Sequence, residues 1–159
     1  MIKILFFTIF LVLNLKAEIK NELFVLPKQS IEVEDKLLNL IDSSNKEIIV
    51  AMYNFSYKKI GERLINASKK GLDVLLILDK KKYKENKDFV KELENNGIKV
   101  ILAEEKMHMK IAIFDNSTLL MGSSNWTKES FKENHEVFLF TNDNKVISDL
   151  SNYLKSQKL

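Results

Sequence analysis

The residues best suited to chemistry lie between positions 108 and 125 of this 159-residue chain. His108 and Lys110 stand two apart, Asp115 follows, and Gly122-Ser123-Ser124-Asn125 completes the pattern H-x-K-x4-D-x6-G-S-x-N. A neutral imidazole can attack phosphorus or carry a proton near neutral pH. An ammonium group neutralises phosphate oxygens, and a hydroxyl and a carboxamide hydrogen-bond them. The pattern therefore predicts a site for a phosphate ester.

The complete pattern resembles the signature of the phospholipase D superfamily, and in particular its small bacterial nucleases, which carry one motif per chain. The resemblance implies that His108 is the nucleophile and forms a phosphohistidine intermediate. It implies that Lys110 and Asn125 bind the non-bridging oxygens of a phosphodiester and that Ser123 assists by hydrogen bonding. These roles fit phosphoryl transfer, which depends mainly on positioning and on stabilising charge on the phosphoryl oxygens.

Glu136 follows His108 at a spacing where the resembled nucleases place a glutamate that contacts the histidine. A carboxylate on Nδ1 would set the tautomer and leave Nε2 free to attack. The alternative is an acidic residue on the surface of a strand. His135, the other histidine, would point to the opposite face of a regular strand, so we do not expect it to be catalytic.

Two further positions of the motif have structural explanations. Asp115 falls in the cluster Asp115-Asn116-Ser117 between two strand patterns, where a side-chain-to-backbone hydrogen bond in a turn accounts for an aspartate. We therefore expect a structural role for it. Gly122 either lets the backbone approach the phosphate closely or simply ends a strand, and the sequence favours neither.

Apolar periodicity predicts the elements that position this site. Strands are expected at 22–26, 47–53, 74–78, 98–102, 107–114, 118–121 and 136–140, and helices at 33–43, 58–70, 86–95 and 145–155. Residues 79–87 are lysine-rich and are predicted to be an exposed loop. Alternating strands and helices indicate an α/β fold with a mixed, largely parallel sheet sandwiched by helices on both faces. The resemblance implies the same phospholipase D/nuclease fold.

The N-terminus has the layout of a secretory signal peptide over residues 1–17, and the resemblance implies a phospholipase D-like nuclease domain at 18–159. A basic start precedes a short apolar run, and Ala17 ends a plausible cleavage site. The expected location is periplasmic or secreted. The alternative is an uncleaved anchor at the inner membrane with peripheral membrane association, although the apolar run is shorter than the roughly 20 residues of a membrane span.

Composition excludes several kinds of site. The chain has no cysteine, so it has neither disulfides nor thiolate zinc ligands. No convincing ligand cluster is visible, and we expect neither a metal nor another cofactor. The formal net charge of +3 falls to +1 without residues 1–17, because that segment holds Lys3 and Lys16 and no acid. Attraction for nucleic acid must therefore come from local patches.

Candidate groove residues flank the motif. Tyr53, Phe55 and Trp126 are placed to stack on unpaired bases, although aromatic residues more often lie in the core. Lysines that could follow a phosphate backbone are Lys58, Lys59, Lys80, Lys81, Lys82 and Lys84. The alternative for each lysine is a solvated surface position.

In-line displacement at phosphorus needs a nucleophile on one side and a proton donor for the leaving oxygen on the other. One motif supplies only His108, so we expect a homodimer that places His108 of each subunit at a shared site. The leading hypothesis is a metal-independent, non-specific endonuclease that acts on DNA and also on RNA, with a preference for single strands. The alternatives are a phospholipase D acting on cardiolipin or a related phospholipid, and a nucleic-acid-binding component of DNA uptake with weak activity.

Overall fold

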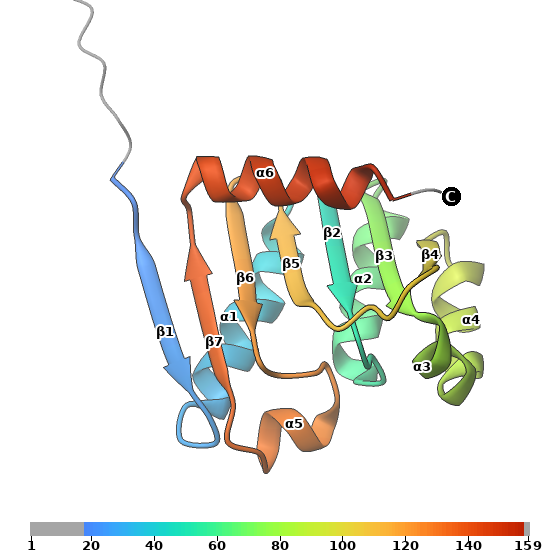
Figure 1. Ribbon diagram of the computed structural model, residues 1–159, viewed down its shortest axis with the longest axis horizontal. Helices are drawn as coiled ribbons and strands as arrows, with labels where there is room; N and C mark the ends of the chain where they lie inside the picture. The colour runs from blue at the N-terminus through green and yellow to red at the C-terminus, as the bar shows by residue number, and fades with distance from the viewer. Residues whose placement is uncertain (1–17, 158–159) are drawn as a thin grey trace, which may run out of the picture.

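The apolar runs of the chain form the strands of one seven-stranded sheet (Figure 1). The computed structural model describes residues 18–157. The strands are β1 (Asn21–Val25), β2 (Glu47–Met52), β3 (Asp73–Asp79), β4 (Lys99–Ala103), β5 (Lys110–Phe114), β6 (Thr118–Gly122) and β7 (Val137–Thr141). The helices are α1 (Ser30–Ser43), α2 (Lys58–Lys69), α3 (Lys80–Glu85), α4 (Lys87–Asn95), α5 (Lys128–Lys132) and α6 (Asn144–Lys155).

The strand order is β1-β7-β6-β5-β2-β3-β4. The mixed α/β class predicted from the sequence is confirmed, but the expectation of a largely parallel sheet is wrong. Only β2–β3 and β3–β4 pair in parallel, and the other four pairings are antiparallel. The length of the connections explains three of the six pairings. A helical crossover joins each parallel pair, whereas the short turn between β5 and β6 permits only antiparallel pairing.

Helices cover both faces of the sheet, but unequally. Figure 1 shows α6 lying alone across one face, with α1 and α2 behind the sheet. The larger core lies on the face covered by α1, α2, α4 and α5, and it contains Ile48, Val50 and Met52 of β2. The smaller core contains Ile49 and Ala51 of the same strand, together with Ile147 and Leu154 of α6. Strand β2 is therefore buried on both sides, as a central strand should be.

Two further expectations have different outcomes. Residues 80–85 form α3 and not an exposed loop, because the Asp79 side chain accepts hydrogen bonds from the N–H groups of Lys81 and Lys82 and caps the helix. The expected signal peptide, residues 1–17, lies outside the described residues. Between residues 18 and 157, no helix is both long enough and apolar enough to cross a membrane.

Candidate active site

His108 and Lys110 lie side by side at the start of β5. The strand begins at Lys110, three residues later than predicted, so His108 belongs to the segment that leads into it. The Lys110 ammonium nitrogen Nζ lies 3.5 Å from Nδ1 of His108 and donates a hydrogen bond of 2.9 Å to the His108 carbonyl. His108 is exposed and Lys110 is half-buried. The two groups can therefore meet one phosphate on the same side of the sheet.

The end of β2 holds this segment in place. The N–H of Tyr53 donates to the carbonyl of Met109 over 3.0 Å, which extends the β2–β5 pairing beyond the strand. The Tyr53 and His108 rings lie 4.6 Å apart between centroids, at an interplanar angle of 54°. Tyr53 is thus the aromatic groove candidate that reaches the predicted nucleophile.

Asn125 lies in the loop that follows β6, and that loop is tied to the chain after β2. The N–H of Trp126 donates to the carbonyl of Asn54, and the Trp126 carbonyl accepts from the N–H groups of Ser56 and Tyr57. The oxygen Oδ1 of Asn125 is buried and has no hydrogen-bond partner among the described residues. Buried polar atoms without partners are rare and mark strained or ligand-binding positions.

Ser123 and Glu136 meet where β6 ends and β7 begins. The Ser123 hydroxyl donates to the Glu136 carboxylate and accepts a 3.1 Å hydrogen bond from the N–H of Val137. The hydrogen bond expected between Glu136 and His108 is not formed within residues 18–157. Strand β6 lies between β7 and β5, and each strand spacing is about 4.8 Å. Glu136 therefore lies two strands away from the start of β5, and its carboxylate accepts a hydrogen bond from Ser123 in place of His108.

Asp115 lies at the opposite end of β5 from His108. Its carboxylate accepts hydrogen bonds from the N–H groups of Asn45, Lys46 and Glu47, at 2.9, 2.8 and 3.1 Å. Asp115 and Asn116 both have φ of 52°, the geometry of the tight hairpin turn predicted there. This geometry supports the structural role expected for Asp115.

Gly122 is required by the neighbouring strand. A Cβ added at this position would lie 2.1 Å from the carbonyl oxygen of Val137, which no side chain can tolerate. Close approach of the β7 backbone therefore accounts for the glycine. Neither a phosphate contact nor a simple strand end is needed to explain it.

Comparison with known proteins matches this arrangement to a family. The family described as cardiolipin synthase, PLD-like domain matches residues 37–158. The chain belongs to the phospholipase D superfamily. This membership confirms the family predicted from the sequence motif.

Individual relatives agree with the family. Phospholipase D of Rickettsia conorii is 30% identical over 121 residues, which are 74% of this chain and 60% of that protein. The human mitochondrial cardiolipin hydrolase is 26% identical over 70% of this chain and 45% of its own length. The chain thus spans roughly half to three fifths of the length of these relatives.

Two solved structures of similar size share the fold. NucT from Helicobacter pylori superimposes with a TM-score of 0.82 at 30% identity, covering 88% of this chain and 96% of that one. Nuc from Salmonella typhimurium, a phospholipase D family member, superimposes with a TM-score of 0.79 at 26% identity, covering 88% and 94%. The described fold is therefore the phospholipase D fold.

Electrostatics favour a neutral His108 in this phospholipase D-type site. The positive charge of Lys110 lowers the pKa of His108 from 6.5, and burial and Lys106 act in the same direction. Burial also lowers the pKa of Lys110, although the nearby carboxylate of Glu136 opposes that shift. An imidazole with a lowered pKa retains its free lone pair at neutral pH, as a nucleophile requires.

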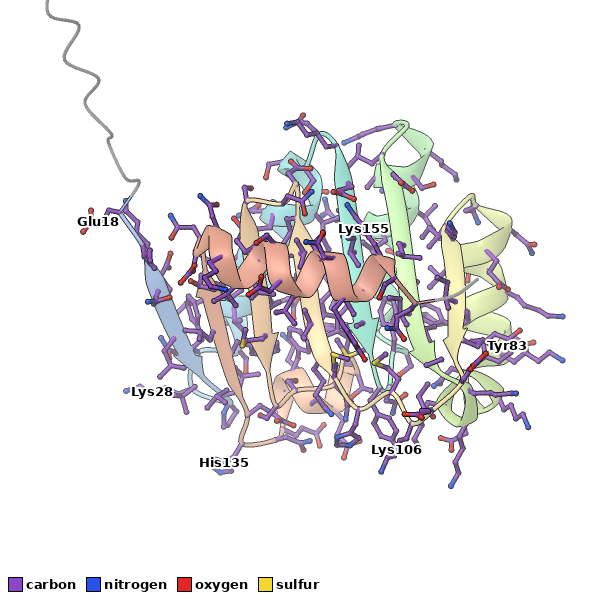
Figure 2. The ribbon with its side chains drawn as sticks, turned by 45° about the horizontal axis from the view of Figure 1, so that its top comes forward. Glu18, Lys28, Tyr83, Lys106, His135 and Lys155 are labelled. Carbon is purple, nitrogen blue, oxygen red and sulfur yellow. The ribbon has the colours of Figure 1, made fainter. Side chains whose placement is uncertain are left out.

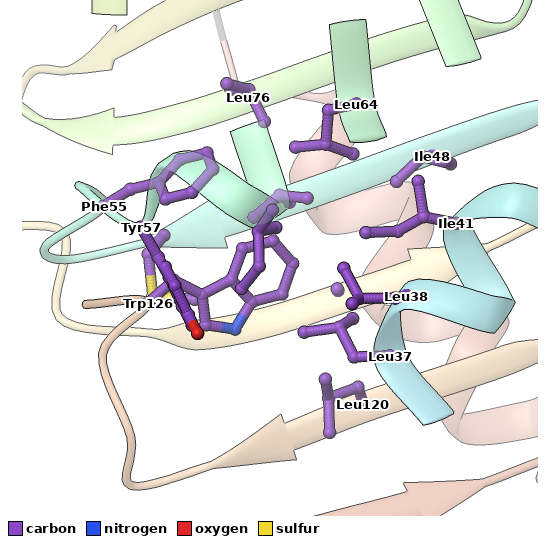
Figure 3. Close-up of a cluster of buried hydrophobic side chains, with 14 of the residues drawn as sticks. Leu37, Leu38, Ile41, Ile48, Phe55, Tyr57, Leu64, Leu76, Leu120 and Trp126 are labelled. Carbon is purple, nitrogen blue, oxygen red and sulfur yellow. The ribbon is translucent and has the colours of Figure 1, made fainter. Parts of the chain in front are cut away.

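Four of the groove candidates, Phe55, Trp126, Lys58 and Lys59, do not reach the site. Phe55 and Trp126 are 2% and 1% exposed and pack edge to face in the larger core, as Figure 3 shows, so their prediction as stacking platforms is wrong. Lys59 pairs with the buried Glu34 at 2.6 Å, on the α1 side of the molecule. Lys58 is exposed at the start of α2, and no hydrogen bond or ion pair joins it to the site among the described residues.

Lys106 is a site residue that sequence reasoning missed. It lies in the segment between β4 and β5, and its ammonium group is 5.8 Å from the centre of the Tyr53 ring. Its position two residues before His108 was the sequence signal that could have identified it as a site residue. Figure 2 shows His135 at the edge of the molecule near the start of β7, well apart from Lys106 and pointing outward.

Two hollows meet at His108. One, of about 560 Å³, lies between the β4–β5 segment and the C-terminal end of α6, where Tyr153 and Ser156 line it. The other, of about 490 Å³, lies over the sheet and is lined mainly by apolar side chains. Between residues 18 and 157, no three histidine, aspartate or glutamate side chains form a group that could hold a metal ion.

Proposed function

We propose that this protein is a metal-independent phosphodiesterase that cleaves nucleic acid with His108 as its nucleophile. The observation that carries the proposal is an exposed histidine beside Lys110, held against Tyr53, in a complete phospholipase D motif. The similarity to NucT and Nuc, two structures of which this chain covers nearly the whole length, supports a nucleic acid as substrate. No element between residues 18 and 157 resembles a base-reading helix, so we expect little sequence specificity.

The reaction would proceed in two displacements. Nε2 of His108 attacks phosphorus, an N–P bond forms, and the bond from phosphorus to the leaving oxygen breaks while that oxygen takes up a proton. A water molecule then attacks phosphorus, gives up a proton, and breaks the N–P bond to release a phosphate monoester. Lys110 and the Asn125 amide would stabilise the non-bridging oxygens in both steps.

The leaving oxygen needs a proton donor, and the other described histidine, His135, points outward at the edge of the molecule, well apart from Lys106 (Figure 2). We propose that a second copy of the chain supplies it, with the two His108 side chains facing one phosphate across a twofold axis. Each histidine would serve as nucleophile or acid according to how the substrate binds.

An apolar row next to His108, exposed at Leu23 and half-buried at its other members, supports this dimer. The strand registers align Leu23, Leu139, Met121 and Ile111 across β1, β7, β6 and β5, on the face that α6 covers only in part. Leu23 is 61% exposed, and the hollow lined by this row also contains His108 and Lys110. A second copy seated on the row would bury it and bring another motif to the site.

The first test is cleavage of labelled single-stranded DNA and RNA in excess EDTA, with wild type and His108→Ala compared. Cleavage by wild type alone would establish a metal-independent nuclease that uses this histidine. The outcome against it is a folded dimer that cleaves neither nucleic acid. If His108→Ala loses DNA affinity as well as cleavage, a DNA-uptake component with weak activity becomes the better description.

The shared site has a separate test. Dimers of one wild-type and one His108→Asn subunit, isolated with two affinity tags, should be nearly inactive because the single site lacks one histidine. Mixed dimers with half of the wild-type activity would show that each subunit works alone.

A phospholipase is the second candidate function. The matching family is described as cardiolipin synthase, two kinds of relative are named phospholipase D and cardiolipin hydrolase, and the apolar hollow beside His108 could hold an acyl chain. The phosphoryl chemistry would be the same. Release of phosphatidic acid from cardiolipin vesicles, without cleavage of DNA or RNA, would favour this candidate.

A further inference from the structure

Three ammonium groups surround the Tyr53 ring beside the predicted nucleophile. The Nζ atoms of Lys110, Lys82 and Lys106 lie 5.3, 5.7 and 5.8 Å from the ring centre. They come from separate places in the fold, the start of β5, helix α3 and the segment between β4 and β5. The fold has therefore gathered these charges around one ring, and they are not neighbours in a single run of lysines.

Acidic groups balance this cluster only in part. Lys82 pairs with Glu85 at 2.5 Å and lies near Asp79, whose carboxylate is already engaged in capping α3. Lys106 lines a hollow with two glutamates, yet it forms no hydrogen bond or ion pair within residues 18–157. Lys106 also lowers the pKa of both the motif histidine and the motif lysine. Lys106 is therefore a cation without an acidic partner among the described residues, and its charge disfavours the charged forms of His108 and Lys110. An anion bound beside Lys106 would relieve this repulsion.

The scissile phosphate does not account for all of these cations. A phosphodiester carries one negative charge, and Lys110 with the Asn125 amide can bind its non-bridging oxygens. Lys82 and Lys106 reach the Tyr53 ring from α3 and from the β4–β5 segment, and their long side chains can extend toward a neighbouring phosphate. A substrate with a second phosphate would place another negative charge near them.

We propose that Lys82, Lys106 and Tyr53 form a subsite for a second phosphate of the same substrate, next to the one that is cleaved. The inference rests on the proposed function and narrows its substrate class to molecules with at least two phosphodiesters. The Tyr53 face holds the two ammonium groups by cation–π attraction until the phosphate arrives. In a polynucleotide, this phosphate is the one flanking the scissile bond.

The test compares substrates that differ by one phosphate. We would measure kcat/KM for a thymidine dinucleotide, which has one phosphodiester, and for a trinucleotide, which has two. Wild type should prefer the trinucleotide by about tenfold, as one charge-assisted hydrogen bond would provide. The Lys82→Gln/Lys106→Gln double variant should lose that preference because its rate falls mainly on the trinucleotide. The salt dependence for the trinucleotide should also become shallower, by about 0.7 in log–log slope for each phosphate that the variant no longer binds.

The matched control is Lys69→Gln/Lys91→Gln, which removes the same charge from two exposed lysines on α2 and α4. This variant should keep the trinucleotide preference. If the Lys82/Lys106 variant lost activity equally on both substrates, the subsite would be overturned. Such a loss would mean that these lysines act at the scissile phosphate or through the overall charge of the protein. Thermal unfolding of each variant would verify that it is folded.

An experiment with lipid vesicles distinguishes a polynucleotide from a phospholipid as the source of the second phosphate. Cardiolipin carries two phosphates and phosphatidylglycerol carries one, so vesicles of each make the same comparison. A preference for cardiolipin that the double variant loses, with neither oligonucleotide cleaved, would keep the subsite and overturn the proposed nuclease function. Absence of a two-phosphate preference in both the oligonucleotide and the vesicle comparison would overturn the subsite, even if wild type cleaves long DNA.

Discussion

The Ser123 hydroxyl joins Glu136 to the backbone of β7, donating to the carboxylate and accepting from the N–H of Val137. This places the acid at the edge of the site, where its charge raises the pKa of Lys110 against the effect of burial. Ser123 and Glu136 therefore act as one unit, with the hydroxyl positioning the carboxylate that supports Lys110.

The first prediction concerns this unit. Ser123→Ala and Glu136→Gln should each lower kcat/KM on single-stranded DNA by about tenfold, and the double variant should lose little more than the worse single variant. The measurement is a double-mutant cycle, with Ser117→Ala in the distant hairpin turn as control. Strictly additive losses would mean that the two side chains act separately.

The second prediction concerns the pH dependence of His108. Because the charges of Lys110 and Lys106 lower its pKa, the neutral imidazole should persist to below pH 6.5. Removing the positive charge in Lys106→Gln should raise the pKa back toward 6.5, and the acid limb of kcat/KM should move to higher pH with it. NMR titration of the His108 ring tests this directly, and an unchanged or lower pKa in the variant would contradict it.

The third prediction concerns Asp115. Asp115→Ala leaves three backbone N–H groups without their acceptor, which should lower the free energy of unfolding by about 2 to 4 kcal/mol. Activity per folded molecule should change little, because five strand residues put Asp115 roughly 16 Å from Lys110. Denaturant unfolding and active-site-normalised rates provide the measurement. Asp115→Asn, which keeps one acceptor oxygen, should lose less stability.

The fourth prediction concerns the buried Glu34, which is 5% exposed. Burial alone would raise its pKa, but hydrogen bonds from Lys132, Lys59 and Tyr57 outweigh that effect and lower it to about 2. Since the folded pKa lies below the unfolded value, this stabilisation is complete above about pH 4.5 and is lost as the pH falls toward 2.

Glu34→Gln should therefore unfold more easily by about 3 kcal/mol at pH 7, and the difference from wild type should shrink in acid. The exposed Glu62→Gln on the neighbouring helix α2 is the control and should change stability by less than about 0.5 kcal/mol. A pH-independent difference between Glu34→Gln and wild type would contradict the assignment.

The fifth prediction concerns the apolar row. Leu23→Asp places a charge on the proposed interface and should convert dimers to monomers and abolish cleavage, while leaving the monomer folded. Ile31 on α1 is 71% exposed but lies outside the row, so Ile31→Asp should change neither property. Light scattering after gel filtration gives the mass of each variant. An active Leu23→Asp monomer would refute the shared site.

Local patterns allow most elements to be predicted, because apolar periodicity reports which face of a helix or strand is buried. Strand direction is harder to predict. The runs at 74–78 and 98–102 indicate parallel strands correctly, but the sheet as a whole is mostly antiparallel, since β5 pairs antiparallel with β2 and β6, and β7 pairs antiparallel with β6 and β1. The lysine-rich composition after Asp79 predicts a loop, whereas the helix found there depends on one side chain reaching two N–H groups, which composition does not reveal.

By itself, the sequence determined the family and the identity of the chemical groups, because the motif constrains residue types at fixed spacing around His108 and Lys110. Only the tertiary structure decided which other side chains share their space. In the folded chain, Phe55 and Trp126 are buried, and Lys82 and Lys106 lie near the Tyr53 ring. The Glu136 carboxylate accepts its hydrogen bond from Ser123. These are contacts between segments distant along the chain, and they depend on strand order and packing, which residue spacing does not encode.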